Sequence, residues 1–415
     1  MRYLFTIVLL SVSFFCFSQD SLINGIEEFK KQDKQDAPDF SKAYSLLQNE
    51  VNQHPEDAQL RYFLGYTIDR MNAEDGKKMI ELKKQLTIKS SEQFEIVNKI
   101  EPIYKGELYL LDPYTKISSI WGSLAESYLS RKLIDSAKWA FKEGKKRGGF
   151  LESVLEYNRQ LLNSCDRNSI LITSGDIITI SIWYLQAIEN FRNDITTVDV
   201  NLINAPWYPK YLKYEKNLKI DLSDEQIDSI NYKEWKPQTI EIINPKNTTQ
   251  KFSWELRPTY MENYILKGDQ ILCNILKQNF FDRPIYFLYD SDSSNNLFLT
   301  PHLQNEGMVD RVVDKLYDST TNFKSVYKNL NFYNIKNLKR EDIIKSRGAI
   351  KLLNGFRIEY FATIDFLLRK GSYDEARVLF KQMESRFDLH KLPFSSDLET
   401  NYFNALNDKI NKNSQ

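Results

Sequence analysis

Six residues between positions 175 and 208 carry the groups best suited to ligand chemistry. They are Gly175, Asp176, Asp199, Asn204, Trp207 and Tyr208. A carboxylate on a glycine turn can bind a metal ion or a sugar hydroxyl, and aromatic rings beside amide side chains suit stacking on sugars or peptides. Asp199 lies about 20 residues beyond the glycine turn, where dinucleotide-binding folds place an acid that binds the ribose. These six residues are the predicted ligand-binding set.

Each member of this set also has a structural interpretation. Asp176 suits a turn in which its carboxylate accepts hydrogen bonds from nearby backbone N–H groups, and Trp207 can cover a sheet. The turn contains one glycine instead of the Gly-x-Gly-x-x-Gly pattern of nucleotide sites, which argues against a nucleotide. Apolar Ile177 and Ile178 follow Asp176 directly. We therefore interpret residues 169–209 first as a structural hub and second as a binding cleft.

The elements that must position this set form a predicted βαβ unit. Residues 169–173 are a short apolar run, residues 180–191 carry apolar side chains at helical spacing, and residues 198–202 alternate between apolar and polar. The two strands of such a unit are parallel and joined by a right-handed crossover. Ligands usually bind at the carboxyl ends of such strands. Gly175, Asp176 and residues 201–207 are therefore the first place to look for a ligand.

Length and charge narrow the class of protein. The chain has 415 residues, enough for two or three domains, and 42% of them are hydrophobic. Lys plus Arg and Asp plus Glu both number 56, so the net charge is zero. A nucleic-acid-binding protein should carry a basic excess, so the composition argues against a nucleic-acid partner.

Residues 1–18 predict a secretory signal peptide. A positive start is followed by an apolar core over residues 4–17, and Cys16 and Ser18 are small residues suited to cleavage before Gln19. The bulky residues 14–15 ahead of Cys16 disfavour lipid attachment. No later apolar run approaches the ~20 residues of a membrane-spanning helix. We expect an exported protein, periplasmic or envelope-associated, without a transmembrane segment in its mature part.

Cysteines and histidines supply little material for a metal site or a catalytic triad. Cys165 and Cys273 remain after the predicted cleavage, and His54, His302 and His390 are isolated from one another. These five residues do not include four ligands at the spacing of a zinc site. An oxidising compartment would permit a disulfide, but buried free thiols are the favoured interpretation. We predict no metal, no cofactor and no catalytic residue.

Residues 19–165 predict a helical domain with features of the tetratricopeptide repeat, a helix hairpin of about 34 residues. Small Ala125 and Ala137 allow two helices to approach closely. The first match consists of Ala43, Leu47, Pro55, Leu64 and Gly65, and the second of Trp121, Leu124, Ala125, Tyr128, Ala137 and Phe141. Residues 145–149, KKRGG, suit the end of a helix better than an anion site.

The remaining chain predicts an α/β module over residues 166–320 and helical hairpins over residues 321–415. In the module we expect strands at 239–243, 250–256 and 284–289, a helix at 263–278, an extended stretch at 297–300 and a helix at 303–313. Glu306 and Arg311 would form an ion pair along that last helix. The C-terminal hairpin has the tetratricopeptide-type residues Gly371, Tyr373, Ala376, Phe380 and Met383. The predicted fold class is α/β plus all-α, with helical hairpins flanking a central parallel or mixed sheet.

Several segments together resemble a known family. The chain is similar to the soluble C-terminal region of bacterial multi-spanning membrane proteins that carry domains of unknown function and are related to protein O-mannosyltransferases. Such proteins are common in the Bacteroidetes. The resemblance rests on ILITSGD at 170–176, WYLQ at 183–186, NLIN at 201–204 with Trp207 and Tyr208, RPIYF at 283–287, and LQNEG at 303–307 with Arg311.

Two departures limit what this resemblance implies. The family usually has Gly-Asp-Asn-Asp-Thr at the turn, whereas this chain has Gly175, Asp176, Ile177, Ile178 and Thr179. The chain also carries no counterpart of the transmembrane sugar-transfer part, where the relatives should hold the sugar donor and the catalytic acid. The resemblance therefore implies a shared accessory module and not a shared activity.

Two hypotheses for function follow. The first is an exported, non-catalytic interaction or scaffold protein of the cell envelope that binds a protein or peptide partner. The second is a glycan-binding or glycan-processing envelope protein that acts through the loops of residues 174–208. The second predicts a deep pocket lined by Asp176, Asp199, Asn204 and Trp207. It fails if the two carboxylates point into packed interior or are bonded to backbone.

Overall fold

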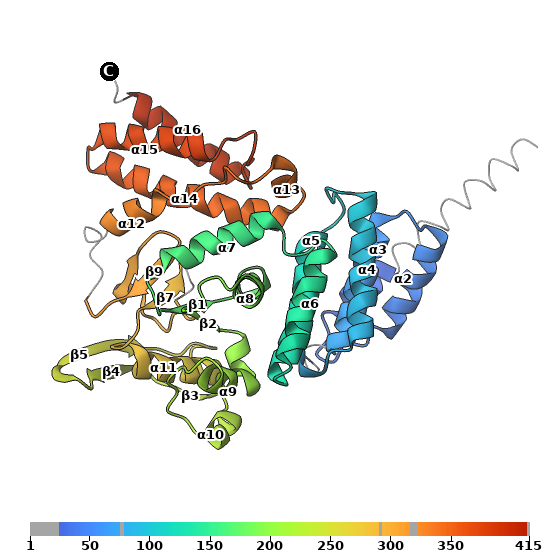
Figure 1. Ribbon diagram of the computed structural model, residues 1–415, viewed down its shortest axis with the longest axis horizontal. Helices are drawn as coiled ribbons and strands as arrows, with labels where there is room; N and C mark the ends of the chain where they lie inside the picture. Colours follow the sequence, from blue (N-terminus) through green and yellow to red (C-terminus); the bar gives the residue numbers. More distant parts are fainter. Residues whose placement is uncertain (1–24, 75–78, 290–292, 316–322, 413–415) are drawn as a thin grey trace, which may run out of the picture. The chain divides into compact units, whose positions relative to one another are not determined.

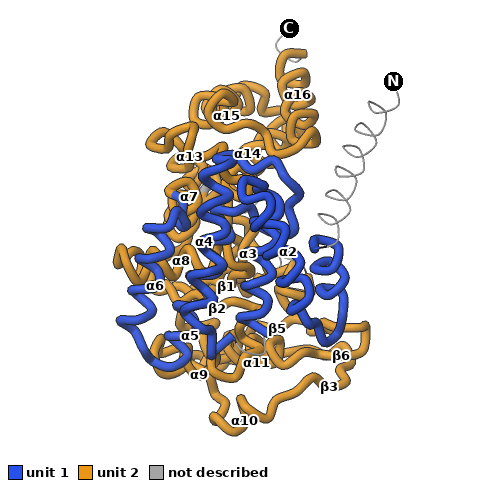
Figure 2. Tube along the Cα trace, turned by 90° about the vertical axis from the view of Figure 1, so that its right-hand side faces the viewer, with its two compact units in different colours: residues 1–151 blue, residues 152–415 orange. Residues whose placement is uncertain are grey.

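The computed structural model describes residues 25–74, 79–289, 293–315 and 323–412. The predicted signal peptide, its cleavage point after Ser18 and the disfavoured lipid attachment at Cys16 lie outside the described residues. The chain divides into two compact units, residues 1–151 and 152–415 (Figure 2). The second unit begins before the boundary predicted at 165/166, and it contains the sheet together with the C-terminal helices.

The first unit is a succession of helices in which each packs on the next. These helices are α2 (Ser41–Gln53), α3 (Ala58–Ala73), α4 (Lys84–Ile100), α5 (Pro113–Ser130) and α6 (Ile134–Lys146) (Figure 1). Ala125 of α5 and Ala137 of α6 are buried, as the close approach of their helices requires. At Gly65 of α3, an added Cβ would come within 2.8 Å of the Phe94 ring of α4. Glycine at this position therefore allows α3 and α4 to pack closely.

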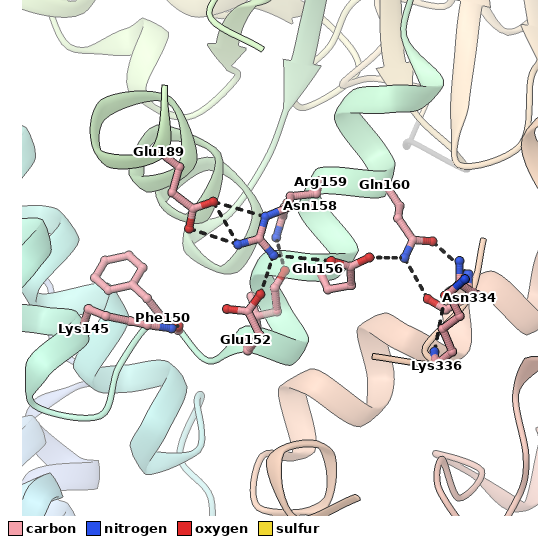
Figure 3. Close-up of polar contacts among 11 residues, drawn as sticks. Lys145, Phe150, Glu152, Glu156, Asn158, Arg159, Gln160, Glu189, Asn334 and Lys336 are labelled. Atoms are coloured by element: carbon pink, nitrogen blue, oxygen red, sulfur yellow. Dashed lines mark hydrogen bonds and ion pairs between the residues drawn. The ribbon is translucent and has the colours of Figure 1, made fainter. Parts of the chain in front are cut away.

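The KKRGG segment ends α6 with internal hydrogen bonds. The Gly149 N–H donates to the Gly144 carbonyl at 2.9 Å, and Gly148 adopts a φ of 97°. Lys145 Nζ donates to the Phe150 carbonyl at 2.6 Å (Figure 3), and Arg147 pairs with Glu95 of α4 at 2.7 Å. Lys146 pairs with Glu143 of the same helix at 3.8 Å. All three cations thus have partners within the fold, which supports the helix-end interpretation of this segment.

The second unit is built on a mixed sheet with the strand order β2-β1-β7-β9-β8. Its strands are β1 (Ile170–Thr173), β2 (Thr196–Asp199), β7 (Ile285–Leu288), β8 (Leu303–Asn305) and β9 (Val309–Val312). Strand β1 is parallel to both β2 and β7, and β9 is antiparallel to β7 and β8. Helix α8 (Asp176–Glu189) connects β1 to β2, so the predicted βαβ unit is confirmed. The second strand ends earlier than predicted because residues 200–204 turn into the short helix η2 (Leu202–Asn204).

The prediction of a helix at 303–313 was wrong. These residues form the β8–β9 hairpin, and the preceding stretch at 297–300 turns into the short helix η3 (Thr300–His302) rather than a strand. The apolar residues at 303, 308, 309 and 312 fit helical spacing, but pairing of β9 with β7 satisfies their backbone within the sheet. Glu306 and Arg311 do pair, at 3.9 Å, across the hairpin and not along a helix.

Further elements of the second unit follow the predicted order. The predicted hairpin is present as β4 (Gln238–Asn244) and β5 (Asn247–Leu256). Helix α11 (Lys267–Asn279) starts later than predicted, because Ile265 belongs to β6 (Tyr264–Ile265), which pairs with β3 (Lys233–Glu234). Helices α9 (Trp207–Tyr214) and α10 (Asp224–Ser229) lie between β2 and β3 in the chain.

Helix α7 (Glu152–Ser164) joins the C-terminal helices to the sheet, and in Figure 1 it lies between them. The C-terminal helices are α12 (Phe323–Leu330), α13 (Arg340–Ile344), α14 (Arg347–Arg369), α15 (Tyr373–Arg386) and α16 (Asp397–Lys412). The Gln160 amide of α7 donates to the Asn334 carbonyl at 2.7 Å and accepts from its N–H at 3.0 Å (Figure 3). Arg159 of α7 binds both carboxylate oxygens of Glu189 on α8, at 3.0 and 2.9 Å (Figure 3).

Cys165 and Cys273 are both buried and free, and burial raises the pKa of the Cys273 thiol to about 11. At neutral pH this thiol is therefore protonated and a poor nucleophile. Among the described residues, no helix combines the length and the apolar character needed to cross a membrane.

Candidate functional site

The predicted ligand-binding set lies at the carboxyl edge of the parallel strands. Gly175 and Asp176 begin α8 just after β1, Asp199 ends β2, and Asn204 ends η2. Trp207 and Tyr208 open α9. Strand order reverses between β1 and β7, and open α/β sheets bind ligands at such a reversal. The topology thus brings the set to the edge where a ligand is expected.

The turn after β1 is shaped by Gly175, whose φ is 85°. Its carbonyl accepts the N–H groups of Ile178 and Thr179 at 3.2 and 3.0 Å and so begins α8. Asp176 is exposed in the first turn of that helix. A carboxylate in this position is favoured by the partial positive charge of the helix N-terminus, whether or not a ligand is present.

Asp199 is buried, with 3% of its surface exposed, and its carboxylate is engaged on both oxygens. Oδ1 accepts the N–H groups of Asn201 and Leu202 at 2.8 and 3.0 Å, and Oδ2 accepts the Thr179 hydroxyl at 2.5 Å. Burial raises the pKa of Asp199, and these hydrogen bonds partly oppose that rise. Asp199 therefore acts as the acceptor that turns the chain from β2 into η2.

Tyr208 and Asn204 are also engaged within the fold. The buried Tyr208 hydroxyl donates to the Thr197 carbonyl at 3.0 Å and accepts the Asp199 N–H at 3.2 Å. Asn204 Oδ1 accepts the Gly268 N–H at 2.9 Å, at the start of α11. An added Cβ at Gly268 would come within 2.8 Å of the Asn204 side chain, so the two segments are in close contact. These contacts join β2, η2, α9 and α11.

The solvent-facing part of the edge includes exposed Ser174, Asp176, Asn201 and Asn204 together with half-buried Trp207. The Asn201 amide donates to the Ser174 hydroxyl at 3.3 Å. Of the predicted set, Asp199 and Tyr208 are buried and engaged in internal contacts. Asn204 is exposed but bonded to the Gly268 N–H, and Asp176 and Trp207 remain accessible. The edge offers an accessible carboxylate, exposed amide side chains and an aromatic ring, which suits a surface contact.

Residues that hold this edge together were missed in the sequence. Thr179 donates to Asp199, and its hydroxyl also lies 2.9 Å from that of Thr173. The sequence carries only a weak signal for this role, because Thr173 fits the pattern of a buried strand and Thr179 fits that of a helix without any special function. Their pairing depends on β1, α8 and β2 being folded against one another.

Replacing Asp199 by alanine should lower the free energy of unfolding by about 2–3 kcal/mol, because two N–H groups and a hydroxyl lose their acceptor. Asp199→Asn keeps the shape and the Oδ1 acceptor and should be tolerated at pH 7. The folded-state pKa is raised, so the contribution of Asp199 is fully present below the unfolded pKa and is lost as pH rises through the folded value. The free energy of unfolding of Asp199→Asn, relative to that of wild type, should therefore increase as pH rises through that window.

Denaturant unfolding at several pH values measures this effect. Exposed Asp176→Asn is the matched control and should change stability by only about 0.5 kcal/mol. A strongly destabilised Asp199→Asn variant at pH 7 would contradict the structural role assigned to the carboxylate.

One family model matches the chain. Residues 154–257 and 229–329 match the model described as TMEM260-associated domain 2. The matched segments together run from α7 to α12 and cover less than half of the chain. No curated protein and no solved structure matches this sequence. The similarity thus concerns the sheet and its surrounding elements, and it begins near the start of the second compact unit.

Proposed function

We propose that this chain is an exported, non-catalytic scaffold of the cell envelope that binds a protein or peptide partner. The observation that supports the proposal is the hydrogen bonding of the polar side chains at the carboxyl ends of the parallel strands. There Asp199, Asn204 and Tyr208, the groups best suited to hold a small ligand, are engaged in hydrogen bonds within the fold. An edge bonded in this way supports a role in recognition by surfaces rather than in catalysis.

The connection between α4 and α5 supplies a surface for such a partner. The Tyr62 hydroxyl of α3 donates to the Leu111 carbonyl at 2.8 Å and accepts the Tyr109 N–H at 2.9 Å, which holds the backbone on both sides of Leu110. The Tyr114 hydroxyl donates to the Pro102 carbonyl at 3.3 Å, next to Ile103. On the same connection Ile103 is 46% exposed and Leu110 is 64% exposed. Apolar side chains on an ordered segment lose little conformational freedom on binding. Ile103 and Leu110 are the residues assigned to the partner surface.

Affinity capture tests this proposal. The mature chain is immobilised, retained envelope proteins are identified by mass spectrometry, and the best candidate is purified and titrated. Ile103→Asp together with Leu110→Asp should weaken its binding more than tenfold, because each buried apolar side chain contributes about 1.5–3 kcal/mol. Leu398→Asp on α16, at a residue that is 76% exposed, is the matched control and should leave binding unchanged. Capture of no protein partner, or a partner insensitive to the double change, would refute the proposal.

Export is proposed on the pattern of residues 1–18 and has its own test. A protein tagged at its C-terminus should be recovered from the periplasmic or envelope fraction, with Gln19 as the first residue by mass spectrometry. Recovery from the cytoplasm with an intact N-terminus would contradict this part of the proposal. Similarity to the accessory region of O-mannosyltransferase-related membrane proteins is likewise proposed, with support from the family match over residues 154–257 and 229–329.

The loops of residues 174–208 are a weaker candidate for glycan binding than the sequence predicted. Asp199 meets the condition that argues against a ligand role, since it is buried and accepts two backbone N–H groups. Asp176 and Trp207 stay accessible. Asn204 is exposed, but its amide is bonded to backbone groups. A saccharide on these loops would therefore be held mainly by one carboxylate and one ring instead of the four predicted residues.

A further inference from the structure

A cavity of about 410 Å³ lies at the opposite edge of the sheet, where β7 begins and β9 ends. It belongs wholly to the second unit, and none of the predicted ligand-binding set lines it. Its volume falls within the range of about 300–1,000 Å³ that is typical of small-molecule sites. The side chains that bear on its chemistry are those of Gln250, Phe281, Arg283, Gln304, Arg311 and Asp314.

The cations of this cavity are already engaged. The Arg283 guanidinium donates to the carbonyls of Asn168 and Ser169 at 2.8 and 2.9 Å. Arg311 pairs with Asp166 at 3.0 Å. These contacts occupy part of the donor capacity of both guanidinium groups, and the carboxylates of Asp282 and Asp314 line the same cavity. The mixed charge favours a neutral ligand over an anion.

One carboxylate of the cavity is engaged as well. Asp282, which also lines the cavity, pairs with Lys219 and with Lys246, and the Lys246 contact measures 3.0 Å. These lysines lower the pKa of Asp282 and keep it ionised. Asp282 is therefore held as an ionised carboxylate and is poorly suited to donate a proton.

Neutral hydrogen-bonding groups remain accessible. Gln304 in the middle of β8 is half-buried, and its amide makes no hydrogen bond with the residues that the structure describes. Gln250 accepts from the Asn244 amide at 2.8 Å through Oε1, which leaves its own NH₂ group available within the described part of the chain. Asp314 is exposed and likewise has no partner among the described residues. Together they offer both donors and acceptors at one cavity.

A rigid aromatic wall completes the site. Phe280 and Phe281 both line the cavity, and their ring centroids lie 4.9 Å apart at 82°. Phe280 is stacked on Phe252 of β5 with a centroid distance of 4.3 Å, which holds the wall in place. Both phenylalanines are only half-buried. A pyranose presents C–H groups on its faces and hydroxyls around its edge. An accessible aromatic ring can pack against the face, while neighbouring amide and carboxylate groups bind the hydroxyls.

We propose that this cavity binds a neutral saccharide of one or two pyranose rings. Phe281 packs against a sugar face, Gln304 and Gln250 bind hydroxyls through their amides, and Asp314 accepts from a further hydroxyl. The proposal does not depend on the protein partner proposed above, because its residues lie in the second unit and the partner residues Ile103 and Leu110 lie in the first.

Saturation-transfer NMR on the full mature chain tests the proposal. The probes are the methyl glycosides of neutral hexoses and N-acetylhexosamines, with methyl glucuronide and inorganic phosphate as charged comparisons. At least one neutral glycoside should receive saturation and give a measurable affinity. Gln304→Ala and Asp314→Ala should each weaken that affinity about fivefold through the loss of one hydrogen bond. Phe281→Leu keeps an apolar side chain and should reduce transfer to the sugar C–H protons.

Gln238→Ala is the matched control, because Gln238 is an exposed strand glutamine at the end of the β4–β5 hairpin remote from Gln250. It should bind as wild type does, and circular dichroism should show that every variant is folded. The proposal is overturned if no neutral glycoside binds, if binding is equal in the control and the Gln304 and Asp314 variants, or if only the charged probes bind.

Discussion

Replacing Arg357 with alanine is expected to lower the free energy of unfolding by about 2–4 kcal/mol. Arg357 of α14 is 2% exposed, and its guanidinium donates to the carbonyls of Phe387 and Leu392, both at 2.6 Å. It also donates to Asn354 Oδ1 at 2.5 Å. Burial lowers the pKa of Arg357 to about 10, so the side chain is still a cation at neutral pH. Alanine would leave two buried carbonyls without a donor.

Chemical denaturation of the full chain measures this loss, and hydrogen exchange over residues 347–392 locates it. Arg357→Lys keeps the charge but has no planar fork for three acceptors, so it should fall between wild type and alanine. Arg369→Ala is the matched control on the same helix, since that side chain is 72% exposed and pairs with Asp365 one turn away. Exposed pairs of this kind contribute less than about 1 kcal/mol. Equal losses at 357 and 369 would contradict the role assigned to Arg357.

Gly307→Ala is expected to destabilise the second unit by about 2–5 kcal/mol, from backbone strain of about 1–2 and crowding of about 1–3 kcal/mol. Gly307 turns the β8–β9 hairpin with a φ of 99°. An added Cβ would lie 2.6 Å from the Tyr333 hydroxyl. That hydroxyl accepts the Met308 N–H at 3.1 Å and lies 2.9 Å from the Ser164 hydroxyl of α7. The substitution would therefore disturb the contact between hairpin, α7 and the C-terminal helices.

Two further variants separate strain from crowding. Gly371 has a φ of 76° and open space around an added Cβ, so Gly371→Ala should show the strain alone, about 1–2 kcal/mol. Tyr333→Phe removes the crowding oxygen, so in that background Gly307→Ala should be less harmful than in wild type. Denaturant unfolding of the four variants forms a double-mutant cycle with its control. A loss at Gly307 no larger than that at Gly371 would show that Tyr333 does not resist the added methyl group.

The central βαβ unit could be predicted from the sequence because its signals are local. A buried apolar run ends in a glycine turn, and a helix-period stripe follows between residues 180 and 191. Parallel pairing of β1 with β2 then follows from the handedness of the crossover. The β4–β5 hairpin was predictable for the same reason, since its turn residues and alternating strands lie next to one another in the chain.

The hairpin at 303–312 and the role of Asp199 were not predictable in this way. The apolar residues of β8 and β9 fit a helix as well as two strands. The strands form because the edge of β7 that does not pair with β1 is available to pair with β9. Asp199 has the sequence spacing of a ligand-binding acid, but its carboxylate oxygens already accept hydrogen bonds from Thr179 and from the backbone of the following turn. A carboxylate held in this way has the same sequence pattern as one that awaits a ligand.

The sequence by itself determined the class of the fold, the order of its main elements and the parallel core, because local periodicity and turn residues specify them. The tertiary structure alone decided which polar groups are accessible. It engages Asp199, Asn204 and Tyr208 at one edge of the sheet. At the other edge it gathers Gln250, Phe281, Gln304 and Asp314 from separate segments around one cavity. The physical reason is that burial and hydrogen-bond satisfaction depend on contacts between residues distant in the chain, which periodicity does not encode.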